Sequence, residues 1–342
     1  MKTVLVTGGA GFIGSNFITH IFHKYPEYKI IVLDALTYAG NIENIPVEIR
    51  DSGRFEFWYG NLNNLDLVDD LVERSQIIVH FAAETHVARS LYLNRVFFIT
   101  DVLGTQSIAN AVLKHSDTVE RFVHISTSEV YGTALKDPMD EEHPLNPTTP
   151  YAAAKAGADR LVYSYVESYG IPGVIIRPFN NYGPHQHLEK VIPRFIASAI
   201  LKEPLTIHGD GSAARDWIFV EDTAKAVDQA MHAQLNVVKG DVFNAGTGVS
   251  ISVLDIAKKI IEIFGLDHTY LTYMEERFGQ VQNHISSTEK AEKQLGFKAN
   301  VMFDEGLLKT IEWYKNNREF WEKQMAMRKV PVKNKSGEIV WY

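Results

Sequence analysis

Short apolar runs alternate with longer amphipathic segments along the first half of the chain. The segments between most of these runs have helical periodicity, as in NFITHIFHKY and DLVDDLVERS. Strands that alternate with helices build right-handed βαβ units, which form a parallel sheet with helices on both faces. The pattern therefore predicts an α/β fold with a doubly wound parallel sheet. The runs expected to form its strands are TVLVTG (3–8), KIIVLDA (29–35), FEFWYGN (55–61), IIVHFAA (77–83), RFVHIST (121–127) and GVIIRPFN (173–180).

The pattern becomes irregular after about residue 180. Short strand candidates (PLTIHGDG and DVFNAGTG) are mixed there with helical segments (SVLDIAKKIIEIF and FDEGLLKTIEWYKNN), which indicates a smaller C-terminal mixed α/β domain. We expect the larger domain to comprise residues 1–178 and about 216–246, and the smaller one residues 179–215 and 247–330. Residues 331–342 form a tail that could be a hairpin turning at Lys335–Gly337.

Composition narrows the possible partners. The 342 residues are 45% hydrophobic and 22% charged, as is usual for a globular protein with a sizeable core. A formal net charge of −8 argues against nucleic acid and anionic membranes as partners. The sequence contains no cysteine, so disulfides, zinc–thiolate sites and a cysteine nucleophile are excluded, and no metal site is expected.

The first residues, MKTVLVTGG, begin a strand at once and lack the basic and apolar regions of a signal peptide. The sequence shows no uninterrupted stretch of 18 apolar residues, so no membrane span is expected. Together these features predict a cytoplasmic protein.

A glycine-rich turn follows the first predicted strand. VTGGAGFIG places Gly8, Gly11 and Gly14 where a helix begins, and such glycines let backbone N–H groups approach a pyrophosphate. Asp34 ends the second predicted strand, twenty residues after Gly14, where a carboxylate accepts hydrogen bonds from an adenosine ribose. Residues 35–38 offer no Arg or Lys for a 2′-phosphate. The combination predicts a dinucleotide site that favours NAD over NADP.

A second motif carries proton-transfer chemistry. YAAAK places Tyr151 and Lys155 one helical turn apart, so both project from the same face. An ammonium group beside a phenol, with a nicotinamide cation nearby, lowers the phenol's pKa towards the working range of a base. About 20 residues earlier a strand ends in STS, and Ser126 or Thr127 could then hydrogen-bond the substrate oxygen. The motif predicts a tyrosine base acting on an alcohol or sugar hydroxyl.

Eight motifs in order resemble the extended short-chain dehydrogenase/reductase family of nucleotide-sugar enzymes, and within it the dTDP-glucose 4,6-dehydratase type. The resemblance runs from residue 2 to about 317. It implies a Rossmann domain, a smaller sugar-nucleotide domain and a homodimer formed through two long helices per subunit. The motifs are VTGGAGFIGSN, LDALTYAGN, HFAAETHVARS, STSEVYG, PYAAAKAGADRLV, NNYGPHQHLEKVIPRFI, HGDGSAARDWIFVED and FNAGTG.

The resemblance also implies a reaction. Tyr151, assisted by Lys155 and Thr127, removes the C4 hydroxyl proton of the sugar as hydride passes to NAD. The 4-ketone acidifies the C5 proton, which Glu129 takes; water leaves from C6, and hydride returns to C6. The product is a 4-keto-6-deoxy sugar.

Binding residues follow from the same resemblance. Lys190 resembles the lysine of the nucleotide loop, and Arg215 and Arg277 resemble arginines that clamp the diphosphate, a task that suits the planar guanidinium fork. The remaining substrate contacts are expected at Glu84, Thr85, His86, Asn181, Ile207, Asn244 and Gln280. Besides the residues of the glycine turn, Asp34, Tyr151 and Lys155, the cofactor contacts are expected at Phe12, Ile13, Asn61, Leu62, Ala82 and Ala83.

The sequence departs from the dehydratase pattern at several positions. Ser128 stands where the dehydratases carry the aspartic acid that protonates the departing C6 hydroxyl, and a serine hydroxyl is too weak an acid for that step. Asn61 and Ala88 replace aspartates, and RFGQVQNH (277–284) replaces the usual RPGHDRRY. Changes at both the acid and the sugar pocket indicate a different sugar or a different step.

Several reactions fit these departures. The first is 4,6-dehydration of another UDP- or dTDP-linked hexose, such as UDP-GlcNAc, with Glu129 serving both C5 and the C6 oxygen. The second is a 5,6-dehydratase or the matching reductase of a 5,6-ene-4-keto sugar. The third is a UDP-glucuronate decarboxylase, since these enzymes also carry a Thr-Ser-Glu run. A 4-epimerase would leave Glu129 superfluous, and the intact set of Thr127, Tyr151 and Lys155 argues against a non-catalytic NAD sensor.

Overall fold

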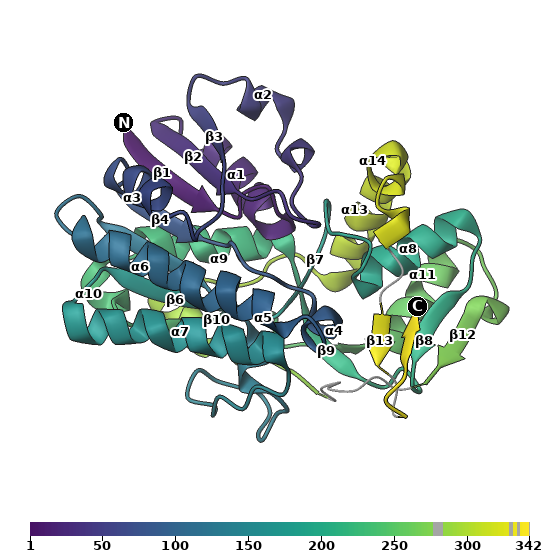
Figure 1. The fold of residues 1–342 in the computed structure, drawn as a ribbon. Coiled ribbons are helices and arrows are strands. Elements are labelled where there is room, and N and C mark those ends of the chain that lie inside the picture. The colour runs from purple at the N-terminus through teal and green to yellow at the C-terminus, as the bar shows by residue number, and fades with distance from the viewer. Residues whose placement is uncertain (276–282, 328–330, 334–335, 342) are drawn as a thin grey trace.

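The computed structural model describes residues 1–275, 283–327, 331–333 and 336–341. A large sheet with its helices occupies one side of the molecule, and a smaller unit built mostly from later residues occupies the other (Figure 1). The carboxyl ends of the large sheet's strands face the smaller unit, and this arrangement positions the site described below.

The large sheet has seven parallel strands in the order β10-β6-β5-β4-β1-β2-β3. At its centre Val4 pairs with Ile30 on one side and with Ile77 on the other. This confirms the predicted doubly wound, Rossmann-type fold. The strands are β1 (Lys2–Thr7), β2 (Tyr28–Asp34), β3 (Phe55–Tyr59), β4 (Ile77–His80), β5 (Arg121–Ile125), β6 (Gly173–Pro178) and β10 (Val242–Ala245).

Helices cover both faces of this sheet, which is why its central strands are apolar almost throughout. Val4 and Val6 of β1 join the core on the face covered by α1 (Phe12–Lys24) and α9 (Val220–His232), whereas Leu5 joins the opposite core. The helices on that opposite face are α3 (Leu65–Glu73), α6 (Gly104–Lys114) and α7 (Pro150–Tyr169).

One helical segment is more apolar than the sequence led us to expect. Within the described residues, Asn94–Lys114 is long and apolar enough to cross a membrane by length and composition. It consists of α5 (Asn94–Phe97), a π-helical stretch η2 (Phe98–Leu103) and α6. Half of its most apolar part is buried, and the segment packs on α7, as the core helix of a globular protein does.

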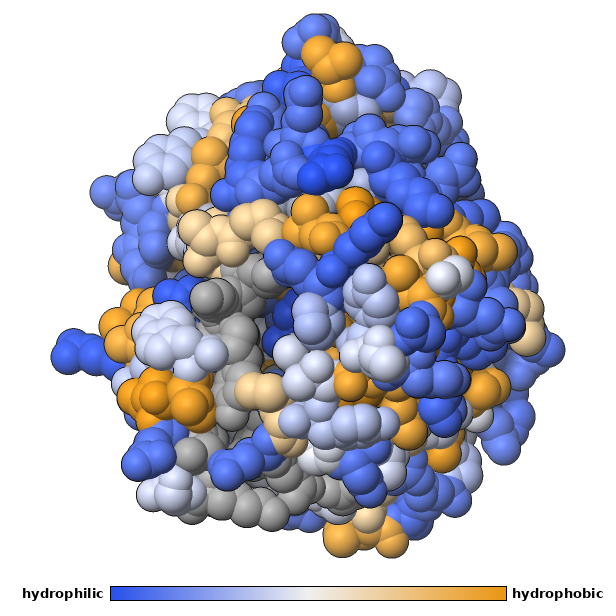
Figure 2. Space-filling view, turned by 90° about the vertical axis from the view of Figure 1, so that its right-hand side faces the viewer, coloured by the Kyte–Doolittle hydropathy of each residue, from blue (hydrophilic) through white to orange (hydrophobic). Residues whose placement is uncertain are grey.

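The smaller unit has a three-stranded sheet (β11-β9-β7), a two-stranded sheet (β12-β8) and its own apolar core. The chain crosses into it after β6 and returns to the large sheet through α9. On the face that Figure 2 shows, apolar residues are scattered among hydrophilic ones. The elements are β7 (Asn180–Tyr182), α8 (Val191–Leu201), β8 (Leu205–His208), β9 (Ala214–Phe219), β11 (Ser250–Ser252), α11 (Val253–Ile263), β12 (Leu271–Met274), α13 (Phe303–Asn316) and α14 (Arg318–Glu322).

The tail pairs with itself. β13 (Pro331–Lys333) and β14 (Ile339–Trp341) are antiparallel, which confirms the predicted hairpin. Tyr92 donates a 3.3 Å hydrogen bond to the Pro331 carbonyl, so the tail contacts the segment after α4 (Val87–Ser90). Short elements complete the chain: η1 (Ile42–Asn44), α2 (Val47–Arg50), η3 (Ser128–Tyr131), α10 (Leu235–Val238), η4 (His268–Tyr270), α12 (Glu289–Leu295) and η5 (Met325–Met327).

Candidate active site

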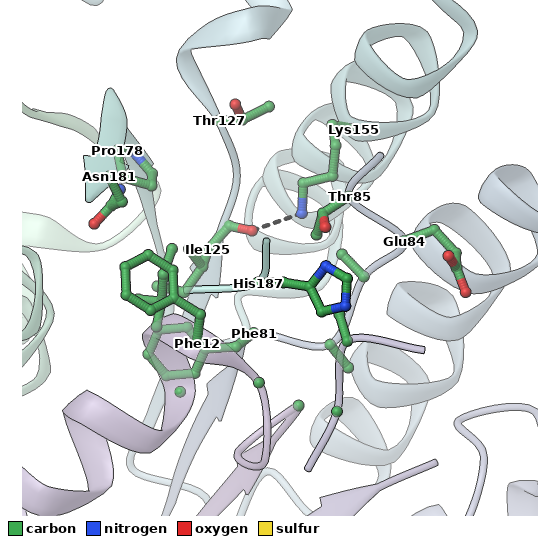
Figure 3. Close-up of a pocket in the computed structure, with 18 of the residues that line it drawn as sticks. Phe12, Phe81, Glu84, Thr85, Ile125, Thr127, Lys155, Pro178, Asn181 and His187 are labelled. Carbon is green, nitrogen blue, oxygen red and sulfur yellow. Dashed lines mark hydrogen bonds between the residues drawn. The ribbon is translucent and has the colours of Figure 1, made fainter. Parts of the chain in front are cut away.

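A cavity of about 360 Å³ lies at the carboxyl ends of the large sheet's strands. Its walls come from the turn between β1 and α1, the ends of β2, β4 and β5, the first turns of α7, and the segment from Pro178 to Ile192. The close-up in Figure 3 shows side chains from these separate elements around one space. Ligands of open α/β sheets bind at this edge.

The glycine turn is built for close backbone approach. Gly8 has a φ of +69°, and a Cβ atom there would lie 2.5 Å from the Ala82 backbone nitrogen. A Cβ at Gly14 would lie 2.4 Å from the Gly8 carbonyl oxygen. Helix α1 begins at Phe12 without a side-chain cap, so its first N–H groups remain available to a phosphate.

Asp34 is fixed at the rim of this turn. Its two carboxylate oxygens accept hydrogen bonds from the backbone N–H groups of Ala10 (2.9 Å) and Leu36 (2.8 Å). Burial raises the pKa of Asp34, and these two bonds oppose that rise. Asp34 and every other residue predicted to contact the cofactor line the cavity. The turn, the carboxylate and the absence of nearby cations at 35–38 fit NAD.

The predicted catalytic residues meet in the same cavity. Thr127, Ser128 and Glu129 follow β5, and the Thr127 hydroxyl accepts a 3.2 Å hydrogen bond from the Glu129 backbone N–H, which fixes the turn η3. Tyr151 and Lys155 project from the start of α7. Helix α7 begins after Thr149, whose hydroxyl accepts a hydrogen bond from the Ala152 N–H. All five predicted catalytic residues line the cavity.

Burial controls the two titrating groups of the YxxxK motif. The pKa of Tyr151 is raised by burial, while a hydrogen bond with Thr127 acts to lower it. This direction is opposite to the one expected from the sequence, because desolvation of the phenolate outweighs the favourable contacts. The pKa of Lys155 is lowered by burial, and Asp101 opposes that shift. The Lys155 ammonium donates a 2.7 Å hydrogen bond to the Ile125 carbonyl (Figure 3).

Asp101 is a carboxylate that the sequence reasoning missed. It is 1% exposed, lies in the π-helical stretch of the Asn94–Lys114 segment, and accepts a 2.8 Å hydrogen bond from the Glu84 backbone N–H. Burial raises its pKa to about 7, and Lys155 opposes the rise. π-helical turns recur at functional sites. In the sequence, the feature that could have identified Asp101 is that it is the single acidic residue within an apolar helical segment.

The predicted substrate contacts divide into groups. Glu84, Thr85, Asn181 and Lys190 line the cavity, and the Lys190 ammonium donates a 3.0 Å hydrogen bond to the Thr85 carbonyl. Arg215 does not line the cavity; burial lowers its pKa, and the charge of Glu129 acts to raise it. Arg277 and Gln280 lie outside the described residues.

Three further predicted substrate contacts have other surroundings and do not line the cavity either. His86 caps α4, accepting a 3.2 Å hydrogen bond from the Arg89 N–H. The Asn244 amide accepts from the Tyr131 hydroxyl at 2.7 Å and donates to the Met139 carbonyl at 3.1 Å. Ile207 is buried in the core of the smaller unit. Their spacing in the sequence could not reveal these neighbours.

A buried acidic group, Glu189, also lines the cavity. Glu189 accepts a 3.1 Å hydrogen bond from the Tyr38 hydroxyl, and it lies 3.5 Å from both the His86 Nε2 and the Lys190 Nζ. Burial acts to raise the Glu189 pKa, but Lys190 and the two neighbouring histidines, His86 and His187, hold it below its usual value. Tyr38, His187 and Glu189 also line the cavity, although the sequence reasoning did not single them out.

Known proteins resemble this chain over most of its length. A family model described as GDP-mannose 4,6 dehydratase matches residues 5–310. The low-salt glycan biosynthesis protein Agl12 of Haloferax volcanii is 42% identical over 92% of this chain and 99% of its own. A dTDP-glucose 4,6-dehydratase of Streptomyces niveus is 38% identical over 93% of this chain and 94% of its own.

Solved structures agree with these relatives. The dTDP-glucose 4,6-dehydratase DesIV of Streptomyces venezuelae, solved with NAD and TYD bound, superimposes with a TM-score of 0.89 at 35% identity. The match covers 94% of this chain and 99% of DesIV. A UDP-glucose 4-epimerase of Thermotoga maritima has the same architecture, with a TM-score of 0.85 at 29% identity over 92% of this chain and 99% of its own.

Proposed function

The chain belongs to the GDP-mannose 4,6-dehydratase family of extended short-chain dehydrogenases/reductases and uses NAD, and we propose that it dehydrates a UDP- or dTDP-linked hexose. The observation that carries the proposal is that Thr127, Glu129, Tyr151 and Lys155 line one cavity with the glycine turn. Bound NAD supplies the hydride acceptor for C4 and the hydride donor for C6.

In this proposal Tyr151 is the base for the C4 hydroxyl. Burial raises its pKa, so the phenolate needs stabilisation, which the Thr127 hydroxyl provides by hydrogen bonding. The Lys155 ammonium, anchored on the Ile125 carbonyl one helical turn away, adds a positive charge beside it. Loss of the C4 hydroxyl proton together with the hydride on C4 leaves a ketone, whose electron withdrawal acidifies the proton on C5.

Glu129 is the base for C5. Its carboxylate is half-buried at the cavity wall, and its backbone is fixed by the Thr127 side chain. Arg215 is close enough for its charge to interact with that of Glu129. The resemblance assigns Arg215 and Lys190 to the nucleotide diphosphate of the substrate; of the two, Lys190 lines the cavity.

One observation favours a second candidate. Ser128 is 2% exposed and has no acidic proton of its own for the C6 oxygen. A 5,6-dehydratase expels the same C6 hydroxyl and would still need this proton, whereas a reductase of a 5,6-ene-4-keto sugar, in which no hydroxyl leaves C6, would not. UDP-glucuronate decarboxylation, in which a β-keto acid loses CO2, would not need it either.

Product analysis decides between these reactions. The purified protein is incubated separately with dTDP-glucose, UDP-glucose, UDP-GlcNAc and UDP-glucuronate, and the products are identified by NMR. We expect a 4-keto-6-deoxy sugar from at least one hexose. Conversion of UDP-glucuronate alone would replace dehydration by decarboxylation, and accumulation of a 5,6-ene would replace it by 5,6-dehydration.

The homodimer predicted from the resemblance has a surface that suits it. Large apolar side chains stand exposed along and just before the Asn94–Lys114 segment, namely Leu93, Val96, Phe98 and Leu103. Such exposure is typical of a helical interface. Light scattering at micromolar protein concentration measures the mass in solution, and a monomeric mass would contradict the proposed homodimer.

A further inference from the structure

Two departures from the dehydratase pattern lie against each other in the fold. The Ser128 hydroxyl is 3.4 Å from His284 Nδ1, although 156 residues separate them in the chain. Ser128 stands in place of the dehydratase aspartic acid, and His284 stands in place of the tyrosine that ends RPGHDRRY. The site thus lacks its usual acid and has gained an imidazole directly behind the vacated position.

The surroundings of the His284 ring suit proton transfer. The ring is fully buried and packs beside the Phe179 ring, with centroids 5.4 Å apart. Its Nδ1 faces Ser128, and its Nε2 has no hydrogen-bond partner among the residues that the structure describes. The Gly132 backbone acts to raise the pKa of the ring. A protonated ring would donate its Nδ1–H to the Ser128 hydroxyl.

We propose that His284 and Ser128 form a relay that delivers a proton to the departing C6 oxygen. The inference rests on the proposed 4,6-dehydration. Ser128 lines the cavity and meets the substrate, whereas His284 does not line it and acts through Ser128, which makes it a positioning residue. The pair replaces the missing carboxylic acid by one hydroxyl and one imidazole.

The step balances. Glu129 takes the C5 proton, the electron pair left on C5 forms the C5–C6 double bond, and the C6–O bond breaks. As it breaks, the Ser128 hydroxyl gives its proton to the leaving oxygen and receives the Nδ1 proton of His284, so water departs and the imidazole becomes neutral. The proton that Tyr151 took from the C4 hydroxyl passes through solvent to His284 and protonates its imidazole again. Glu129 keeps its proton for return to C5.

Charged groups from two elements, η3 and β9, act on the pKa of the His284 ring. Burial lowers the pKa of His284; Glu129 from η3 raises it, Arg215 from β9 lowers it, and Asp216 from β9 raises it. The net direction is downward, so the protonated ring is a minor species at neutral pH and increases as the pH falls. The elimination step should then accelerate up to about tenfold for each unit of decreasing pH above the ring's pKa.

The experiment separates elimination from the earlier chemistry. The substrate is the nucleotide sugar that the wild-type protein converts, and the pH is varied between 6 and 9. Exchange of the C5 proton is followed in D2O by mass spectrometry. Formation of the 6-deoxy product is followed by NMR. In His284→Gln we expect C5 exchange within threefold of wild type, product formation reduced about 100-fold or more, and no acceleration at low pH. Ser128→Ala should behave alike.

A variant that recovers product formation provides the decisive test. The double variant Ser128→Asp, His284→Tyr restores the dehydratase pattern and should recover most of the product formation without the acceleration at low pH. His268→Gln removes an exposed histidine of the smaller unit and should leave rate and pH profile unchanged. Melting temperature and NAD content confirm that each variant is folded.

Two results overturn the relay. Product formation and pH profile equal to wild type in His284→Gln would refute the relay alone, because dehydration would proceed with Glu129 as the single acid and base. Absence of any 6-deoxy product from the wild-type protein would refute the proposed function and the relay together.

Discussion

The ammonium group of Lys155 donates a 2.7 Å hydrogen bond to the backbone carbonyl of Ile125, the last residue of β5. The contact joins the first turns of α7 to the strand that carries Thr127. It holds Tyr151, one helical turn before Lys155, beside the Thr127 hydroxyl. The buried lysine therefore connects α7 to β5 and also places a positive charge near Tyr151.

Tyr151→Phe should reduce formation of the 4-keto sugar by about 10²- to 10⁴-fold, because it removes the base for the C4 hydroxyl. Product formation is measured by NMR, with NAD content as the test that the fold is kept. Tyr169→Phe is the matched control, since Tyr169 is exposed at the far end of the same helix. Turnover of Tyr151→Phe equal to wild type would refute the mechanism.

Glu129→Gln should abolish exchange of the C5 proton with solvent deuterium, because an amide cannot accept that proton. Oxidation at C4 should remain measurable, since Tyr151 and Lys155 are untouched. Mass spectrometry of the sugar after incubation in D2O reports both, with the 4-ketone trapped by borodeuteride. Glu142→Gln removes an exposed carboxylate of the loop after η3 and should change neither. If the C5 proton still exchanged at the wild-type rate in Glu129→Gln, another residue would be the base for C5.

Gly14→Ala should weaken NAD retention and lower stability by about 1–3 kcal/mol, because its Cβ would lie 2.4 Å from the Gly8 carbonyl, a backbone atom that cannot move aside. Co-purified NAD and the melting temperature are the measurements. At exposed Gly53 a Cβ meets no heavy atom within 4 Å, so Gly53→Ala serves as the control. Equal NAD content in both variants would show that the turn does not hold the cofactor.

Asp228→Asn should lower stability at pH 7 by about 1–3 kcal/mol, since Asp228 joins α9 to α1 through His20 (2.7 Å) and Lys24 (2.6 Å). Burial acts to raise the pKa of Asp228, but hydrogen bonds from His20, His232, Lys24 and Tyr25 hold it far below its usual 3.8.

A depressed carboxyl pKa stabilises the fold above the unfolded-state value and loses that contribution as the pH falls below it. The difference between wild type and Asp228→Asn should therefore be full above about pH 5 and shrink below pH 4, as measured by urea unfolding. Glu289→Gln breaks an exposed pair with Lys293 and should cost under about 1 kcal/mol. A difference independent of pH would contradict this account.

Local patterns in the sequence determined the fold class and the cofactor turn. Alternation of apolar strands with amphipathic helices predicts the parallel sheet because side-chain direction repeats every 2 residues in a strand and every 3.6 in a helix. Two further predictions were also local. The spacing of Gly8, Gly11 and Gly14 predicted a turn for the cofactor, and the four-residue step from Tyr151 to Lys155 predicted a shared helix face.

Only the tertiary structure decided which distant groups meet. Asp101 approaches Lys155 through helix packing, and Asn244, expected at the sugar, instead bonds Tyr131. The sequence showed Ser128 and His284 as two separate departures, and the fold brings them to 3.4 Å. Such contacts depend on how whole elements pack, and neither hydrophobic periodicity nor residue spacing encodes the neighbours of a side chain more than a hundred residues away.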